Sequence, residues 1–212
     1  MFKSIASGVA LLLAGVSVQA QAQVANGGFE DPIVGNSCCD TYTGGFPGWT
    51  VTTGDVNIVN GTYASSAGNL AFEGGQYLDL IGQSGAGAIA QSIATEAGRS
   101  YLLTFAYSHN LFSGLAEASA NVTIGGLDVD FTHTGGTTSD LNWQLFSGRF
   151  TATSASTLLS FTNLTGGTND GVFLDAVSIA AVPEPATWGM MIGGMGVVGG
   201  TLRRRRVTVA YA

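Results

Sequence analysis

Short segments that alternate apolar and polar residues most constrain how this chain folds. In residues 100–108, Tyr101, Leu103, Phe105 and Tyr107 occupy every second position, which is the spacing of a strand with one buried face. Similar runs recur between residues 48 and 181, and glycine-rich turns separate them. We find no amphipathic helix of convincing length and no internal repeat there. The pattern therefore predicts an all-β domain.

The expected strands number about ten, enough for two packed antiparallel sheets in a sandwich or jelly roll. The strands are expected at residues 48–52, 56–59, 70–72, 76–81, 88–94, 100–108, 118–124, 127–133, 141–151, 157–162 and 172–179. Residues 33–48 and 60–69 are predicted loops. We expect the last strand to lie near the opening segment, because the termini of a domain are commonly close together.

The N-terminus has the three parts of a secretory signal peptide. Lys3 precedes an apolar run at 9–18, and small residues follow at positions 20 and 22. Cleavage after Ala20 or Ala22 fits this pattern. We therefore assign residues 1–22 to a signal peptide and residues 23–181 to one exported domain.

The C-terminus combines a short motif, an uncharged segment and a basic block. Pro183-Glu184-Pro185 precedes residues 186–202, which contain no charged side chain, and Arg203, Arg204, Arg205 and Arg206 follow. Seventeen residues are at the short end of what crosses a hydrocarbon core of about 30 Å. The arginines are expected to stay cytoplasmic, with residues 207–212 as a short cytoplasmic tail. A plain membrane anchor is the alternative interpretation.

In this order of parts, residues 182–206 resemble the PEP-CTERM sorting signal of exported bacterial proteins. The resemblance implies recognition and cleavage by exosortase, a membrane protease. The precursor would be held in the inner membrane, and the mature form would reach the cell surface or the extracellular polysaccharide matrix.

The exported domain is strongly acidic. Its only basic residues are Arg99 and Arg149, against thirteen acidic ones, so residues 23–182 carry a net charge of −11. Such a surface repels nucleic acid and anionic lipid and favours cations. We therefore expect no nucleic-acid partner.

Several segments of the domain resemble, in order, the galactose-binding-like jelly roll and, more narrowly, DUF642-type exported domains. The matching segments are residues 26–30, 48–49, 77–80, 97–105, 143–150 and 173–178. The family commonly closes with two consecutive aspartates, but here the second is Ala176, so any role of that carboxylate is absent. The resemblance implies non-catalytic carbohydrate binding.

The resemblance also implies one structural calcium ion where the first strand meets the last. Glu30 and Asp175 match the two carboxylate positions. Calcium takes six to eight oxygen ligands, so two carboxylates with backbone oxygens are chemically adequate. The alternative is that both are edge charges or local acceptors in turns.

Exposed aromatic side chains are the candidates for stacking on sugar rings. Tyr63 and Phe112 lie in predicted loops, whereas Trp49 and Trp143 lie at strand positions where core packing is favoured. Tyr107 is a further candidate. Arg99 and Arg149 are the only basic hydrogen-bond donors of the domain.

The remaining reactive side chains give no catalytic pattern. Cys38 and Cys39 are adjacent, which leaves a strained vicinal disulfide, pairing with another chain, or two plain thiols. His109 and His133 are predicted to be ordinary surface residues. Nucleophile elbows, zinc-helix motifs and P-loops are missing, so we expect no enzyme. The alternatives to a glycan-binding or adhesive protein are a purely structural matrix protein and a polysaccharide-active enzyme.

Overall fold

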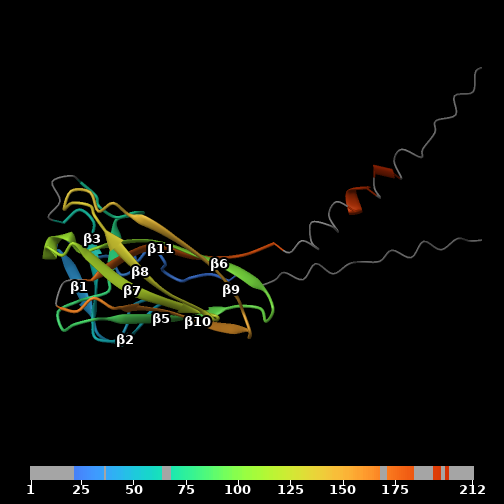
Figure 1. The fold of residues 1–212 in the computed structure, drawn as a ribbon, viewed down its shortest axis with the longest axis horizontal. Coiled ribbons are helices and arrows are strands. Elements are labelled where there is room, and N and C mark those ends of the chain that lie inside the picture. The colour runs from blue at the N-terminus through green and yellow to red at the C-terminus, as the bar shows by residue number, and fades with distance from the viewer. Residues whose placement is uncertain are drawn as a thin grey trace, which may run out of the picture.

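A computed structural model describes residues 22–35, 37–63, 68–167, 171–183, 193–196 and 199–200. The described residues between 22 and 183 form two antiparallel sheets and one turn of 3-10 helix, and residues 193–196 and 199–200 are helical (Figure 1). The elements are β1 (Cys39–Tyr42), β2 (Thr50–Thr53), β3 (Val56–Asn60), β4 (Gln76–Asp79), β5 (Ala88–Ala94), β6 (Ser100–His109), η1 (Leu111–Ser113), β7 (Glu117–Ile124), β8 (Leu127–Thr134), β9 (Gln144–Thr151), β10 (Ser156–Asn163) and β11 (Val172–Ala181). The predicted all-β sandwich is confirmed.

The two sheets interleave strands from distant parts of the chain. One has the order β1-β3-β4-β11-β6-β9 and the other β2-β5-β10-β7-β8. The C-terminal strand β11 lies inside the first sheet, where Leu174 is opposite Leu78 of β4 and Tyr107 of β6. The first sheet is therefore complete only when the end of the domain has been inserted between earlier strands.

Aromatic rings fill the layer between the sheets. Phe105 of β6 packs edge-to-face on Phe161 of β10, with ring centroids 5.0 Å apart, and lies 5.1 Å from the ring of Phe131 of β8. Phe105 also stacks on Phe146 at 4.6 Å. Such contacts add about 0.5–1.5 kcal/mol each to the gain from burial, so β6 is the apolar centre of the domain.

Two buried glutamines fasten the opening segment to the sandwich. Gln91 of β5 accepts a hydrogen bond from Ala25 N and donates to Ala25 O. Gln76 of β4 donates to Phe29 O and accepts from Val34 N. In addition, Val177 N of β11 donates a hydrogen bond to Gly27 O of the opening segment. The prediction that the opening segment meets the last strand is confirmed.

Most predicted strands are present, with two differences. The predicted strand at 70–72 is wrong, because these residues belong to a turn whose amides bind Asp175 and whose Leu70 packs on the outer face of the first sheet. The predicted loop at 33–48 contains β1, which pairs with β3 from Cys39 opposite Val59 to Tyr42 opposite Val56. Strands β7 and β8, both predicted, pair as a hairpin about Gly125 and Gly126.

The predictions for the two termini lie mostly outside the described residues. This holds for the signal peptide, for Glu184 and Pro185, and for Arg203 to Arg206. The expected membrane span at 186–202 is described only in part. Among the described residues, no helix has the length and apolar character needed to cross a membrane.

Gly27 offers a direct test of how the opening segment docks on β11. Gly27 O accepts a hydrogen bond from Val177 N at 2.9 Å, and a Cβ at Gly27 would overlap the carbonyl oxygen of Val177. We expect Gly27→Ala to lower the free energy of unfolding by about 2 kcal/mol or more, measured by chemical denaturation. Gly44→Ala is the matched control, because its added Cβ meets nothing within 4 Å. Equal stability of the two variants would contradict this docking.

Candidate ligand pocket

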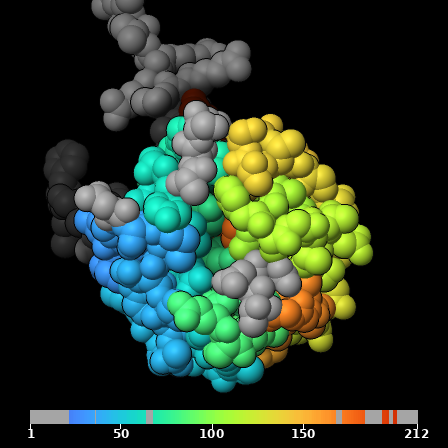
Figure 2. All heavy atoms as spheres, turned by 90° about the vertical axis from the view of Figure 1, so that its left-hand side faces the viewer, coloured from blue at the N-terminus to red at the C-terminus, as the bar shows by residue number. Residues whose placement is uncertain are grey.

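The first sheet has a pocket on its outer face, toward the end of the sandwich where β3 and β11 begin. Strand β4 is buried on both faces: Leu78 points into the core, while Tyr77 and Asp79 point outward. Figure 2 looks onto this end of the molecule. The pocket has a volume of ≈ 290 Å³. It is lined by Cys38, Cys39, Asn57, Val59, Tyr63, Tyr77, Asp79, Asn110, Phe112 and Phe173.

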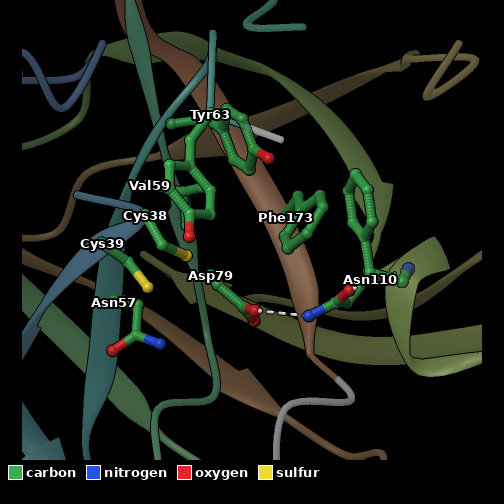
Figure 3. A pocket seen from close by; sticks show the side chains of 10 residues that line it. Cys38, Cys39, Asn57, Val59, Tyr63, Asp79, Asn110 and Phe173 are labelled. Atoms are coloured by element: carbon green, nitrogen blue, oxygen red, sulfur yellow. Dashed lines mark hydrogen bonds between the residues drawn. The ribbon is translucent and has the colours of Figure 1, made fainter. Parts of the chain in front are cut away.

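Strand register explains why these residues meet. Asn57, Asp79 and Phe173 form one cross-strand row through β3, β4 and β11. Two residues along, Cys39, Val59 and Tyr77 form the next row through β1, β3 and β4. Side chains two residues apart share a face, so both rows make the floor of the pocket (Figure 3).

Two exposed aromatic residues stand beside this floor. Tyr63 follows β3 and is 47% exposed, and Phe112 in η1 is 46% exposed. The floor beneath contains Tyr77 and Phe173, whose ring centroids are 4.7 Å apart. The structure therefore brings both loop aromatics predicted from the sequence to one pocket, together with two buried rings that the sequence did not single out.

Polar groups of the pocket are fixed by hydrogen bonds. Asp79 is 2% exposed; its Oδ1 accepts from Ile81 N and its Oδ2 from Asn110 Nδ2, each at 3.1 Å. Asn57 Oδ1 accepts from Thr41 Oγ1 at 2.8 Å. Held side chains of this kind lose little conformational freedom when a ligand binds.

Cys38 and Cys39 are free thiols that line the pocket together. Burial raises the pKa of the Cys39 thiol to about 12, and a hydrogen bond with Cys38 adds to this effect. Cys39 is therefore a neutral thiol at pH 7 and contributes no charge to the pocket.

The two tryptophan candidates do not line the pocket. Trp49 is 3% exposed, packs in the core against Phe161, and donates its indole N–H to Asn26 O. Trp143 is half-buried and donates its indole N–H to Leu70 O. Its ring packs edge-on against Tyr77 at 5.7 Å, so Trp143 supports the pocket floor from the side.

Glu30 and Asp175 both bind the turn at residues 72–76. Glu30 Oε1 accepts hydrogen bonds from the amides of Gly75 and Gln76. Asp175 Oδ2 accepts from the amides of Phe72 and Glu73, at 3.0 and 3.1 Å. The two carboxylates thus meet on one turn, as expected if the start and end of the domain are adjacent.

The observed partners of these oxygens are amide N–H groups, which occupy lone pairs that a cation would need. The described residues include no group of three or more His, Cys, Asp or Glu side chains placed to hold a metal ion. The geometry is that of carboxylates serving as acceptors for a turn. Calcium binding at Glu30 and Asp175 stays a prediction.

Burial makes Asp175 sensitive to pH. It is fully buried, and this burial raises its pKa to about 7, with Glu73 contributing, although hydrogen bonds from three amides oppose the rise. The following residue, Ala176, has a φ of 52° at a bulge of β11. Above pH 7, Asp175 is therefore ionised in the folded domain, and the burial of this charge lowers the free energy of unfolding.

The histidine prediction is wrong, because His109 and His133 are both fully buried and in contact. Their Nδ1 atoms are 2.6 Å apart, and their Nε2 atoms face Leu115 O and Asn142 O. The pair joins the end of β6 to β8, and it anchors the loop that carries Asn110 and Phe112. Burial lowers the pKa of His133, with His109 adding to this effect.

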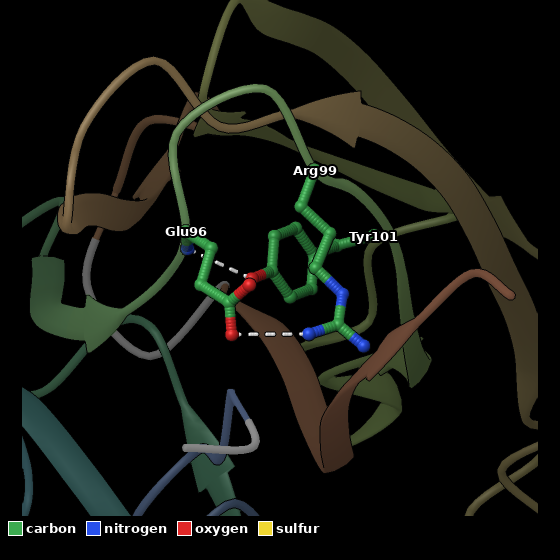
Figure 4. A network of polar contacts seen from close by, with 3 residues as sticks. All are labelled: Glu96, Arg99 and Tyr101. Carbon is green, nitrogen blue, oxygen red and sulfur yellow. Dashed lines mark hydrogen bonds and ion pairs between the residues drawn. The ribbon is translucent and has the colours of Figure 1, made fainter. Parts of the chain in front are cut away.

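Arg99 belongs to a different end of the molecule. It forms an ion pair with Glu96 at 3.1 Å, and its guanidinium lies 6.0 Å from the centre of the Tyr101 ring (Figure 4). Tyr101 OH in turn accepts a hydrogen bond from Glu96 N. Arg149 is opposite Leu102 on β9. The two basic candidates therefore do not reach the pocket.

Comparison with known protein families identifies the family to which the domain belongs. Residues 22–180 match the family described as "Protein of unknown function (DUF642)". The chain belongs to the DUF642 family. Residues 181–206 match the PEP-CTERM protein-sorting motif, so the DUF642 domain is followed directly by a sorting signal, as the sequence predicted.

Relatives and solved structures extend this comparison. The chain is 32% identical over 188 residues to Halomucin of Haloquadratum walsbyi; the match covers 84% of this chain and 2% of Halomucin. The DUF642 domain also resembles the carbohydrate-binding module TmCBM61 in complex with β-1,4-galactotriose, with a TM-score of 0.46 and 16% identity over 74% of this chain and 96% of that one. The xylan-binding CBM22-1 domain of Paenibacillus barcinonensis Xyn10C is also similar, with a TM-score of 0.42 and 16% identity over 71% of this chain and 99% of that domain. Likeness this distant identifies no ligand for this chain.

Asp175 gives a pH prediction with a defined sign. An unfolded Asp has a pKa near 3.9, so between about pH 4 and 7 the folded state holds a proton that the unfolded state releases. The contribution of Asp175 to stability is therefore greatest below about pH 4 and is lost as the pH rises to 7. We expect Asp175→Asn to remove this loss, so that the difference in melting temperature between wild type and variant changes between pH 5 and 8. A constant difference in melting temperature would contradict the raised pKa of Asp175.

Thermal melts at pH 8 with calcium or with a chelator test the predicted calcium ion, and identical melting curves would argue against it.

Proposed function

We propose that this chain is an exported bacterial surface protein whose DUF642 domain binds glycans in the pocket on the outer face of the first sheet. The match of residues 181–206 to the sorting motif supports export and surface sorting. The observation that carries the binding function is the lining of the pocket: exposed Tyr63 and Phe112 stand over a floor with fixed amide and carboxyl groups. Sugar sites combine such apolar and polar groups, because a sugar ring has apolar faces and hydroxyl edges.

Binding fits the pocket better than hydrolysis does. Glycoside hydrolases generally use two carboxyl groups, one on each side of the bond that is cleaved. Among the described residues that line the pocket, Asp79 is the one carboxyl group. Its oxygens accept hydrogen bonds from Ile81 N and Asn110 Nδ2. We therefore favour a non-catalytic adhesive role, with a structural matrix protein that lacks a specific ligand as the second candidate.

Substitution of the two loop aromatics tests the binding function. Loss of one stacked ring removes about 0.5–1.5 kcal/mol, so Tyr63→Ala and Phe112→Ala should each weaken glycan binding by up to about tenfold. The measurement is a glycan array that includes the host's own exopolysaccharide, followed by titration calorimetry. Leu158→Ala on β10 is the control, since Leu158 is exposed and lies on the other sheet. Absence of binding by the wild type to every glycan would favour the structural role.

The sorting function has its own test in the native host. Replacement of Pro183, Glu184 and Pro185 by alanine should leave a precursor of higher mass in the membrane fraction, because an exosortase would no longer recognise its motif. Immunoblots of membrane and medium fractions measure this, and Leu158→Ala is again the control. Release of the triple variant at the wild-type rate would show that the segment is not a processing signal.

A further inference from the structure

The wall of the pocket contains two neighbouring thiols that face the same way. Cys38 precedes β1, and Cys39 is the first residue of that strand. Neighbouring side chains of a regular strand point to opposite faces, yet both cysteines line the pocket, and Figure 3 shows both sulfur atoms on its side of the chain. A hydrogen bond also links the Cys39 thiol to Cys38. The backbone at the start of β1 therefore brings the two thiols together.

Oxidation within the chain can join these thiols only to each other. Cys38 and Cys39 are the only two cysteines of the sequence. Both are half-buried free thiols, so small molecules in the pocket can reach them. Residues 181–206 match a sorting motif that implies export, and the compartments outside the bacterial cytoplasm are oxidising. This location favours a disulfide over two free thiols.

We propose that Cys38 and Cys39 form a reversible vicinal disulfide in the exported protein, and that this bond strengthens ligand binding in the pocket. The oxidant is an organic disulfide, R–S–S–R. Formation of the bond rests on the proposed export of the chain, and its effect on the pocket rests on the proposed glycan binding.

Thiol–disulfide exchange forms this bond in two steps. The thiolate of Cys38 attacks one sulfur of R–S–S–R, which gives a mixed disulfide and releases the first R–S⁻. Burial raises the pKa of Cys39 to about 12, so Cys39 reacts second: it loses its proton, its sulfur attacks Cys38 Sγ, and the second R–S⁻ leaves. The two thiol protons end on two R–SH molecules, and the two electrons lost by the cysteines reduce R–S–S–R.

The short distance between neighbouring residues makes this bond easy to reverse. Consecutive Cα atoms are about 3.8 Å apart across a trans peptide bond, whereas the two Cα atoms of an ordinary disulfide are about 4.4–6.8 Å apart. Departure from the ordinary geometry makes a disulfide more reducible. A thiol reductant therefore returns the pair to its free form.

Backbone hydrogen bonds connect the two cysteines to the aromatic rim of the pocket. Cys38 O accepts a hydrogen bond from Asn60 N at 2.9 Å, and Asn60 O accepts one from Tyr63 N at 3.0 Å. Closure of the disulfide ring rotates the backbone beside Cys38 and so acts on the turn that holds Tyr63. It also replaces two separate thiols with one rigid apolar S–S edge. A more rigid wall loses less conformational entropy when a sugar ring binds.

Thiol counting tests the bond itself. The exported protein is isolated from its host with iodoacetamide present at lysis, and alkylation is measured by intact mass spectrometry. We expect a monomer with no alkylated cysteine before reduction and with two after reduction. Two alkylated cysteines without reduction, or a covalent dimer on a non-reducing gel, would overturn the inference. Cys39→Ser is the control, because its single thiol cannot close the ring and should be alkylated without prior reduction.

Titration calorimetry with and without a phosphine reductant tests the effect on the pocket. The probe is the host's own exopolysaccharide. Because the chain has no other cysteines, the reductant acts on this pair alone. We expect reduction to weaken binding by about threefold to tenfold. The double variant Cys38→Ser/Cys39→Ser should bind like the reduced protein and should not respond to the reductant. Equal affinity of the oxidised and reduced wild type would overturn the link between the disulfide and the pocket.

The two measurements separate this inference from the proposed function. If the disulfide forms but neither redox state binds any glycan of the array, the modification site stands and the proposed glycan binding fails. If the protein binds glycans while both thiols of the exported form are free, the proposed function stands and the disulfide is wrong.

Discussion

The apolar layer between the two sheets is the interaction on which the rest of this structure depends. Phe105 lies at its centre and contacts rings from β8, β9 and β10. Because β6 is also the long neighbour of β11, the same strand fixes both the core and the position of the C-terminal strand. The floor of the pocket is carried on β1, β3, β4 and β11, so its geometry follows from this packing.

The outer face of the first sheet shows a second level of organisation. In β4, the side chains that point away from the core are also buried, because loops and turns cover them. Leu70, Tyr77, Leu141 and Phe173 form a small apolar cluster there, with the pocket beside it. The buried His109–His133 contact fastens the loop that carries Phe112. A binding surface on rigid strands, with aromatic residues on anchored loops, is the arrangement expected for a preformed site.

Acidic residues contribute in three distinct environments. Glu30 and Asp175 accept hydrogen bonds from the amides of one turn and so join the two ends of the domain. Asp79 accepts a hydrogen bond from Asn110 in the pocket. Asp128 and Asp130 of β8 both accept hydrogen bonds from Asn121 of β7 at the protein surface.

The sequence by itself determined the strands with clear alternation, the two-sheet class, the sorting tail and the two loop aromatics, because each depends on local periodicity or local composition. It failed at β1, at residues 70–72 and at His109 and His133. Only tertiary structure decided those, because β1 becomes a strand by pairing with β3, and the histidines are buried by partners distant in the chain. The pocket itself arises from cross-strand rows that join Asn57, Asp79 and Phe173. Register between strands that are far apart in sequence is set by packing of the whole domain, and no local pattern of residues records it.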